Sequence, residues 1–122
     1  MVIWLGIFLT ICDIGSLGGI TVGFFMARIT LVRHGKAEMP RIGGNDFERA
    51  LVRRGIQNSE EIGFFMQAHK MLPELVLVSP AARTRQTYEL MSTNWPDSTR
   101  VHYEDKLYNV TADILLQLIF EH

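Results

Sequence analysis

Cysteine is nearly missing from this sequence, and neither sign of charge is in excess. A single cysteine, Cys12, among 122 residues excludes an internal disulfide and a zinc site built from several cysteines. Twelve basic and thirteen acidic residues give a net charge of -1, which excludes an overall basic character suited to nucleic acid or a membrane surface. Any anion site must therefore be local. The length and the 48% hydrophobic content suit one small domain.

Basic residues are also absent before Arg28. This stretch is mostly apolar and long enough to cross a bilayer as a helix, but Asp13 near its middle and several glycines disfavour a membrane helix. A signal peptide is disfavoured because no charged region precedes the apolar one. We interpret residues 1–26 as an apolar N-terminal extension. Either these residues result from a start codon placed upstream of the natural start at Met26, or they form a membrane anchor. Residues 27–122 are the expected domain, which is cytoplasmic unless the extension anchors it to a membrane.

From residue 29 onward, short strand-like runs alternate with segments of helical periodicity. The first two runs are fully apolar, as in buried strands, and the periodic segments predict helices with one apolar face. The expected strands are residues 29–32, 75–78 and 100–103, and the expected helices are residues 57–71, 81–91 and 111–121. This order predicts an α/β fold with three layers, α/β/α, and a mostly parallel sheet.

Two polar clusters directly follow the first two expected strands. Arg33, His34 and Gly35 follow one strand, and residues 79–87, which contain two further arginines, follow the other. Ligands of open α/β sheets gather beyond the carboxyl ends of the strands, so neighbouring strands would bring both clusters to one pocket. Guanidinium groups match phosphate oxygens, and the start of the following helix adds N–H donors. The sequence therefore predicts a site for a phosphate-like oxyanion.

A histidine in such a site has a chemical role. Neutral imidazole is nucleophilic near physiological pH, and it can form a covalent phosphohistidine that water later hydrolyses. Phosphoryl transfer depends mainly on positioning and on cations that neutralise the equatorial oxygens. The pattern therefore predicts phosphoryl transfer through His34, with arginines around it.

Both clusters resemble the motifs of one known family. Leu-Val-Arg-His-Gly at residues 31–35 resembles the signature of the histidine phosphatase superfamily, whose histidine becomes phosphorylated. Residues 79–87 match the pattern Ser-Pro-x-x-Arg-x-x-Gln-Thr, with a spacing similar to that of small SixA-type phosphohistidine phosphatases. The resemblance covers nearly all of residues 28–122. It implies a phosphoglycerate mutase-like fold and a metal-independent phosphatase that uses no cofactor.

The resemblance also assigns roles to five residues. It implies that His34 is the nucleophile and that Arg33 and Arg83 clamp the phosphoryl oxygens, so these three are the expected catalytic residues. Gly35 and Ser79 join the two arginines as expected substrate-binding residues. No residue is expected to bind a metal or a cofactor.

Two features depart from the family pattern. The second catalytic histidine, which follows a later strand in the family, is missing because the chain ends at His122. We interpret His69 and His102 as structural or surface residues, which do not replace the missing histidine. We therefore expect a C-terminally truncated domain with an incomplete sheet and impaired activity. The glutamate that protonates alkoxide leaving groups in mutase-like members is also missing, since its context reads Leu-Tyr-Asn at residues 107–109.

The missing acid favours phosphohistidine over a phosphate ester as the substrate. An alkoxide needs a proton to leave, whereas imidazole, with a side-chain pKa of about 6.5, leaves neutral once its other nitrogen takes a proton from solvent. Glu104, Asp105 and Asp113 are near enough in sequence to supply an acid, so a broader phosphomonoesterase stays open. An inactive phosphate-binding fragment is the third alternative. The expected partner is a phosphorylated protein, such as a histidine phosphotransfer domain, or a small phosphate ester, and not nucleic acid.

Overall fold

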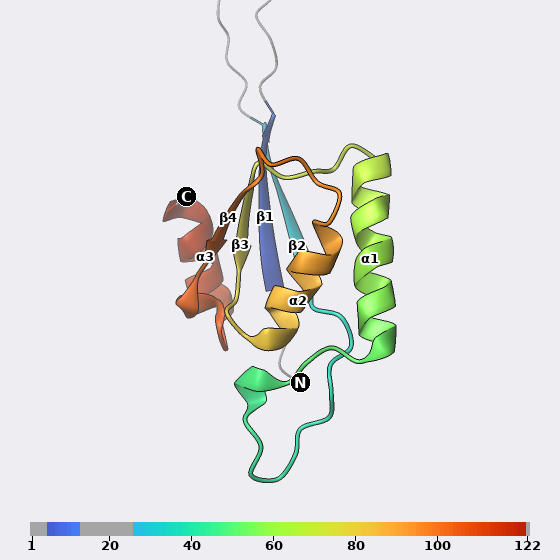
Figure 1. The fold of residues 1–122 in the computed structure, drawn as a ribbon. Helices are drawn as coiled ribbons and strands as arrows, with labels where there is room; N and C mark the ends of the chain where they lie inside the picture. The colour runs from blue at the N-terminus through green and yellow to red at the C-terminus, as the bar shows by residue number, and fades with distance from the viewer. Residues whose placement is uncertain (1–4, 13–25, 122) are drawn as a thin grey trace, which may run out of the picture.

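A computed structural model of the chain describes residues 5–12 and 26–121 (Figure 1). The strands in these ranges are β1 (Leu5–Cys12), β2 (Met26–Arg33), β3 (Leu75–Val78) and β4 (Arg100–Tyr103). The α-helices are α1 (Arg53–Ala68), α2 (Ala82–Met91) and α3 (Ala112–Glu121), and the short 3-10 helices are η1 (Asp46–Glu48) and η2 (Asp105–Leu107). The strands and helices expected from residue 29 onward are therefore present, with ends that differ by a few residues.

Side chains of β3 are buried on both faces of the sheet. Val76 and Val78 belong to the core beneath α1 and α2, whereas Leu77 packs on the other face with Leu107 and Leu118. Figure 1 shows α1 and α2 on one side of the sheet and α3 on the other. Because both faces of β3 are covered, the strand is apolar throughout rather than alternating. The expected α/β/α architecture is confirmed.

The sheet has the order β2-β1-β3-β4. β3 and β4 are parallel, and β1 is antiparallel to both β2 and β3, so β2, β3 and β4 run in the same direction. The expectation of a mostly parallel sheet is confirmed, with β1 as the exception. β1 pairs with β2 along its whole length, from Leu5 opposite Arg33 to Cys12 opposite Met26.

β1 comes from the apolar N-terminal extension, which was not expected to join the sheet. It separates β2 from β3, so the two strands that lead to the polar clusters are not direct neighbours. Two interstrand spacings, roughly 9.5 Å, lie between them. Both strands still end at the same edge of the sheet, because they run in the same direction on either side of β1. The clusters can therefore meet only if side chains or a helix reach across β1.

The remainder of the N-terminal extension, residues 1–4 and 13–25, lies outside the described residues. Its two explanations, an upstream start codon and a membrane anchor, stay predictions, as does the division of the chain at residue 26. In the described part of the chain, no helix combines the length and the apolar character that crossing a membrane requires.

Candidate active site

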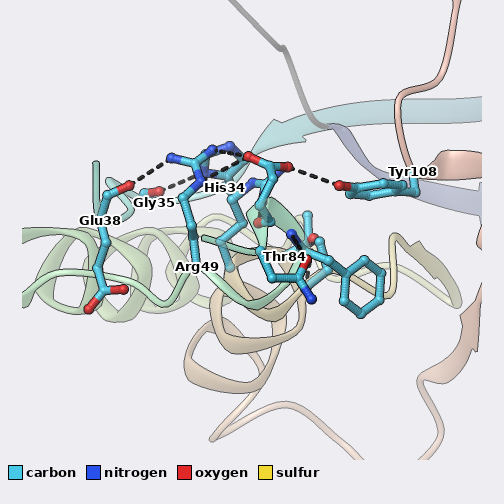
Figure 2. Close-up of polar contacts among 11 residues, drawn as sticks. His34, Gly35, Glu38, Arg49, Thr84 and Tyr108 are labelled. Carbon is cyan, nitrogen blue, oxygen red and sulfur yellow. Dashed lines mark hydrogen bonds and ion pairs between the residues drawn. The ribbon is translucent and has the colours of Figure 1, made fainter. Parts of the chain in front are cut away.

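A pocket of about 770 Å³ lies beside the carboxyl end of β2. Its wall is formed by the end of β2 and the residues that follow it, by the loop before α1, and by the α1 and α2 helices. The lining includes Arg33, His34, Gly35, Asp46, Arg49 and Thr87. Figure 2 shows His34, Gly35 and Arg49 at this site, with Tyr108 joining the polar network from the right of the view. The cluster expected after the first strand therefore lines one pocket.

The imidazole of His34 is half-buried, and its orientation is fixed by its neighbour. Nδ1 lies 2.7 Å from the carbonyl oxygen of Gly35. Because a carbonyl oxygen only accepts, this contact places the proton on Nδ1 and leaves Nε2 with its lone pair. Burial lowers the pKa of His34 below its ordinary value, and the charges of nearby arginines lower it further, although the Gly35 contact raises it. His34 is therefore neutral near physiological pH, which is the nucleophilic form.

Gly35 is held between α1 and α2. Its N–H donates to the Thr87 hydroxyl over 3.0 Å, and that hydroxyl donates to the Arg83 carbonyl oxygen over 2.7 Å. A Cβ added at Gly35 would lie 2.6 Å from the carbonyl oxygen of Gly55 near the start of α1, so no larger residue fits without displacement. Thr87 thus spans the distance that β1 imposes and joins the first cluster to the second.

The loop between β2 and α1 is anchored by α2. Gln86 accepts a hydrogen bond from the N–H of Leu51 over 2.7 Å, and Val52 donates to the Lys36 carbonyl oxygen over 2.9 Å. Gln86 and Thr87 therefore fix two parts of the chain near the pocket, at Leu51 and at Gly35. These hydrogen bonds explain why a glutamine and a threonine are adjacent in the motif at residues 79–87.

Arg83 is present beside the site but is not part of the pocket lining. Its side chain is fully buried, and its Nη1 and Nη2 atoms bind the backbone oxygen and the Oδ2 atom of Asp46 over 2.7 and 3.1 Å. Its charge still reaches His34, whose pKa it helps to lower. The role of Arg83 as a clamp on phosphoryl oxygens stays a prediction.

The carboxylate of Asp46 is the centre of a polar network. Arg49 contacts Oδ1 through Nε and Nη2, each over 2.9 Å, and the Tyr108 hydroxyl donates to Oδ2 over 3.0 Å. Burial favours the neutral acid, but the hydrogen bond from Tyr108 and the charges of Arg83 and Arg49 outweigh it, so the pKa of Asp46 lies below its ordinary value. Asp46 is therefore ionised at neutral pH.

Ser79 lies in the interior, directly after β3. It is fully buried, it is not part of the pocket lining, and its hydroxyl has no hydrogen-bond partner among the described residues. The α2 helix begins at Ala82, with Ala81 in the N-cap position. The role of Ser79 in substrate binding stays a prediction.

The candidate acids and the other histidines lie outside the pocket lining. Glu104 caps η2 by accepting from the N–H of Lys106 over 3.0 Å, Asp105 begins η2, and Asp113 lies in the first turn of α3. His69 ends α1 and contacts a carbonyl oxygen of that helix, and His102 lies on β4. Within residues 5–12 and 26–121, no three His, Cys, Asp or Glu side chains are grouped so as to hold a metal ion.

Sequence reasoning missed Asp46, Arg49 and Tyr108. An acidic and a basic residue three apart, such as Asp46 and Arg49, are common on surfaces and carry little signal by themselves. Tyr108 occupies only the unspecified middle position of the Leu-x-Glu context, in which Asn109 replaces the glutamate. The contacts that make these residues part of the site join segments up to 62 positions apart in the chain, and such contacts are absent from any local pattern.

Residues 29–115 match the family model of the histidine phosphatase superfamily, branch 1. Among curated proteins, the chain is similar to an uncharacterized chloroplastic protein of Arabidopsis thaliana. The two are 26% identical over 87 residues, which cover 70% of this chain and 40% of that protein.

Solved structures give a similar result. A proposed phosphohistidine phosphatase SixA from Agrobacterium tumefaciens matches with a TM-score of 0.67 and 32% identity, over 71% of this chain and 56% of that chain. A second, from Nakamurella multipartitia, matches with a TM-score of 0.58 and 30% identity, over 70% and 46%. The protein histidine phosphatase SixA complexed with tungstate shares the fold, with a TM-score of 0.59 at 22% identity, over 70% and 55%. The chain thus spans about half the length of each of these three structures.

Proposed function

The chain belongs to the histidine phosphatase superfamily, and from this premise we propose that it is a phosphohistidine phosphatase in which His34 accepts the phosphoryl group. The substrate is a protein phosphorylated on histidine, such as a histidine phosphotransfer domain. The reaction requires no metal and no cofactor. We place it in the cytoplasm, with attachment to a membrane as the alternative if residues 1–26 form an anchor.

One observation carries the proposal: a neutral, half-buried imidazole with Nε2 available lies in a pocket that Arg33 and Arg49 also line. In the first step Nε2 of His34 attacks phosphorus, and the bond between phosphorus and the substrate imidazole breaks. The departing imidazole takes a proton from solvent and leaves neutral. Water then attacks the phosphohistidine, which releases inorganic phosphate and restores His34.

The acidic residue in the pocket supports phosphohistidine over an ester. Of the described lining residues, Asp46 is the single carboxylate, and its lowered pKa leaves it ionised at neutral pH. It therefore has no proton to give to an alkoxide leaving group. Imidazole is a far better leaving group because its ordinary pKa is about 6.5. A broader phosphomonoesterase and a non-catalytic phosphate-binding fragment are the alternatives.

The test compares two substrates in single turnovers, so that slow release of phosphate does not obscure the first step. One substrate is a protein phosphorylated on histidine, and the other is glycerol phosphate, whose leaving group is an alkoxide. We expect the histidine substrate to lose its phosphoryl group at least tenfold faster, His34→Ala to abolish the reaction, and His69→Ala to leave it unchanged. Equal rates would favour the phosphomonoesterase. Phosphate binding without any transfer would favour the binding fragment.

A further inference from the structure

The loop before α1 carries an arginine whose guanidinium is fixed in one orientation. Nε and Nη2 of Arg49 contact Oδ1 of Asp46, and Nη1 donates to the carbonyl oxygen of Glu38 over 2.7 Å. Because a guanidinium has five N–H groups, these contacts leave two N–H groups for which the described part of the chain supplies no acceptor. An arginine held in this way loses little conformational entropy when it binds a ligand.

Asp46 is itself fixed by segments that are distant in the sequence. Arg83 from α2 and Tyr108 from the segment after η2 both bind Oδ2, on the side of the carboxylate away from the Arg49 contacts. Arg83 has no exposed surface, whereas the Asp46 side chain is 45% exposed and Arg49 is 19% exposed. The carboxylate of Asp46 thus lies between a buried arginine and one that reaches the surface.

Arg49 shares the pocket with His34. It lines the same cavity as His34 and Arg33, and its positive charge contributes to the lowered pKa of His34. Arg83, the other arginine bound to Asp46, does not line this cavity. Together Arg49, Asp46 and Arg83 carry a net charge of one positive unit, so the network still attracts an anion after the carboxylate is neutralised.

A phosphoryl group in transfer carries charge on three equatorial oxygens, and cations on more than one side stabilise it. Arg33 supplies one such cation directly before His34. We propose that Arg49 is a further phosphoryl-binding residue of the His34 pocket, and that Asp46 is the positioning residue that aims it. This inference rests on the proposed function, because it names a second contact for the same phosphoryl group.

The competing explanation is an ordinary ion pair. Exposed pairs three residues apart contribute about 0.3–0.5 kcal/mol, and many contribute nothing measurable. Such a pair would brace the loop and leave anion binding unchanged. In a second competing explanation, the Asp46 carboxylate occupies the position that a bound anion would take, because it already binds two arginines. These readings differ in the direction in which anion affinity changes when Arg49 or Asp46 is replaced.

The experiment measures binding of tungstate and of inorganic phosphate to the full chain by calorimetry, with urea denaturation as the check on folding. We expect Arg49→Ala to weaken binding about ten- to a hundredfold, which corresponds to the loss of charge-assisted hydrogen bonds. Arg49→Gln retains a donor for Asp46 but no charge and should weaken binding similarly, whereas Arg49→Lys should restore part of it. Arg41→Ala, an arginine of the same loop outside this cavity, is the matched control and should bind as the wild type does.

Asp46→Asn provides the test of positioning. We expect it to weaken anion binding several-fold, because Arg49 loses its charged partner while the amide keeps a similar shape. Tighter binding would show that Asp46 competes with the anion and would overturn the positioning role. Folded Arg49→Ala and Arg49→Gln proteins that bind tungstate and phosphate as tightly as Arg41→Ala would overturn the proposal. Arg49-dependent binding without phosphoryl transfer to His34 would refute the proposed function and leave this inference standing.

Discussion

Replacing Thr87 with valine tests how α2 holds the nucleophile in place. Valine keeps the size of threonine but removes the hydroxyl that accepts from the Gly35 N–H and donates to the Arg83 carbonyl oxygen. Thr87 is 5% exposed, so little water can take over the lost acceptor. An unpaired buried N–H costs about 1–3 kcal/mol. The Arg83 carbonyl adds less because it keeps its hydrogen bond within the helix.

We expect Thr87→Val to lower the free energy of unfolding by about 1–2 kcal/mol, since Gly35 is only partly buried. Urea denaturation measures this change, and the rate of phosphoryl transfer to His34 measures its effect on the site. That rate should fall at least tenfold in protein that is still folded, because Gly35 also accepts the Nδ1 contact that orients the imidazole.

Two further variants make the result specific. Thr87→Ser keeps the hydroxyl and should retain most of the stability and most of the transfer rate. Thr84→Val removes a buried hydroxyl one turn earlier whose single partner within the described residues is the Ala81 carbonyl oxygen, over 3.1 Å. No N–H of these residues is then left unpaired, so the cost should stay below about 1 kcal/mol. If Thr87→Val is as stable as Thr84→Val and transfers phosphoryl at the wild-type rate, the account of the Gly35 anchor is wrong.

Other expected results concern packing and pH. Gly35→Ala should lower the free energy of unfolding by about 1–3 kcal/mol in urea denaturation, because its Cβ would lie 2.6 Å from the Gly55 carbonyl oxygen; unchanged stability would contradict this. Leu118→Ala, at a side chain with 1% exposure, should cost about 2–5 kcal/mol, and a cost below 1 kcal/mol would argue against a packed core beneath α3. The transfer rate should rise with pH to a plateau whose midpoint lies below 6.5, because burial lowers the pKa of His34. The same lowered pKa makes His34 contribute stability above pH 6.5 that is lost as the pH falls through its folded-state pKa, and a His34→Gln variant should lack this pH dependence.

Local sequence patterns were sufficient for most of the fold. Residues 75–78 form a buried strand because an apolar run of that length between Pro73 and a polar cluster suits no other element. β1 was not predicted because residues 5–12 belong to a longer apolar stretch that gives no local signal of where a strand begins or ends. Its pairing with β2 and β3 is a property of the whole chain.

The residues of the site were also only partly predictable from local sequence patterns. Arg33, His34 and Gly35 are adjacent in the sequence, so one strand end places them together in the pocket. The role of Arg83 toward the same anion stays a prediction, and its hydrogen bonds to Asp46, 37 positions earlier, could not be foreseen. Such a pairing depends on how the loop before α1 folds over α2, and nothing near Arg83 in the sequence indicates it.

Mapping the phosphoryl group is the most direct test of the central claim. The chain is incubated at neutral pH with a protein phosphorylated on histidine, and tandem mass spectrometry then locates the modified residue. The account predicts an acid-labile phosphoryl group on His34. A phosphoryl group on any other residue, an acid-stable one, or none at all in folded protein would contradict it.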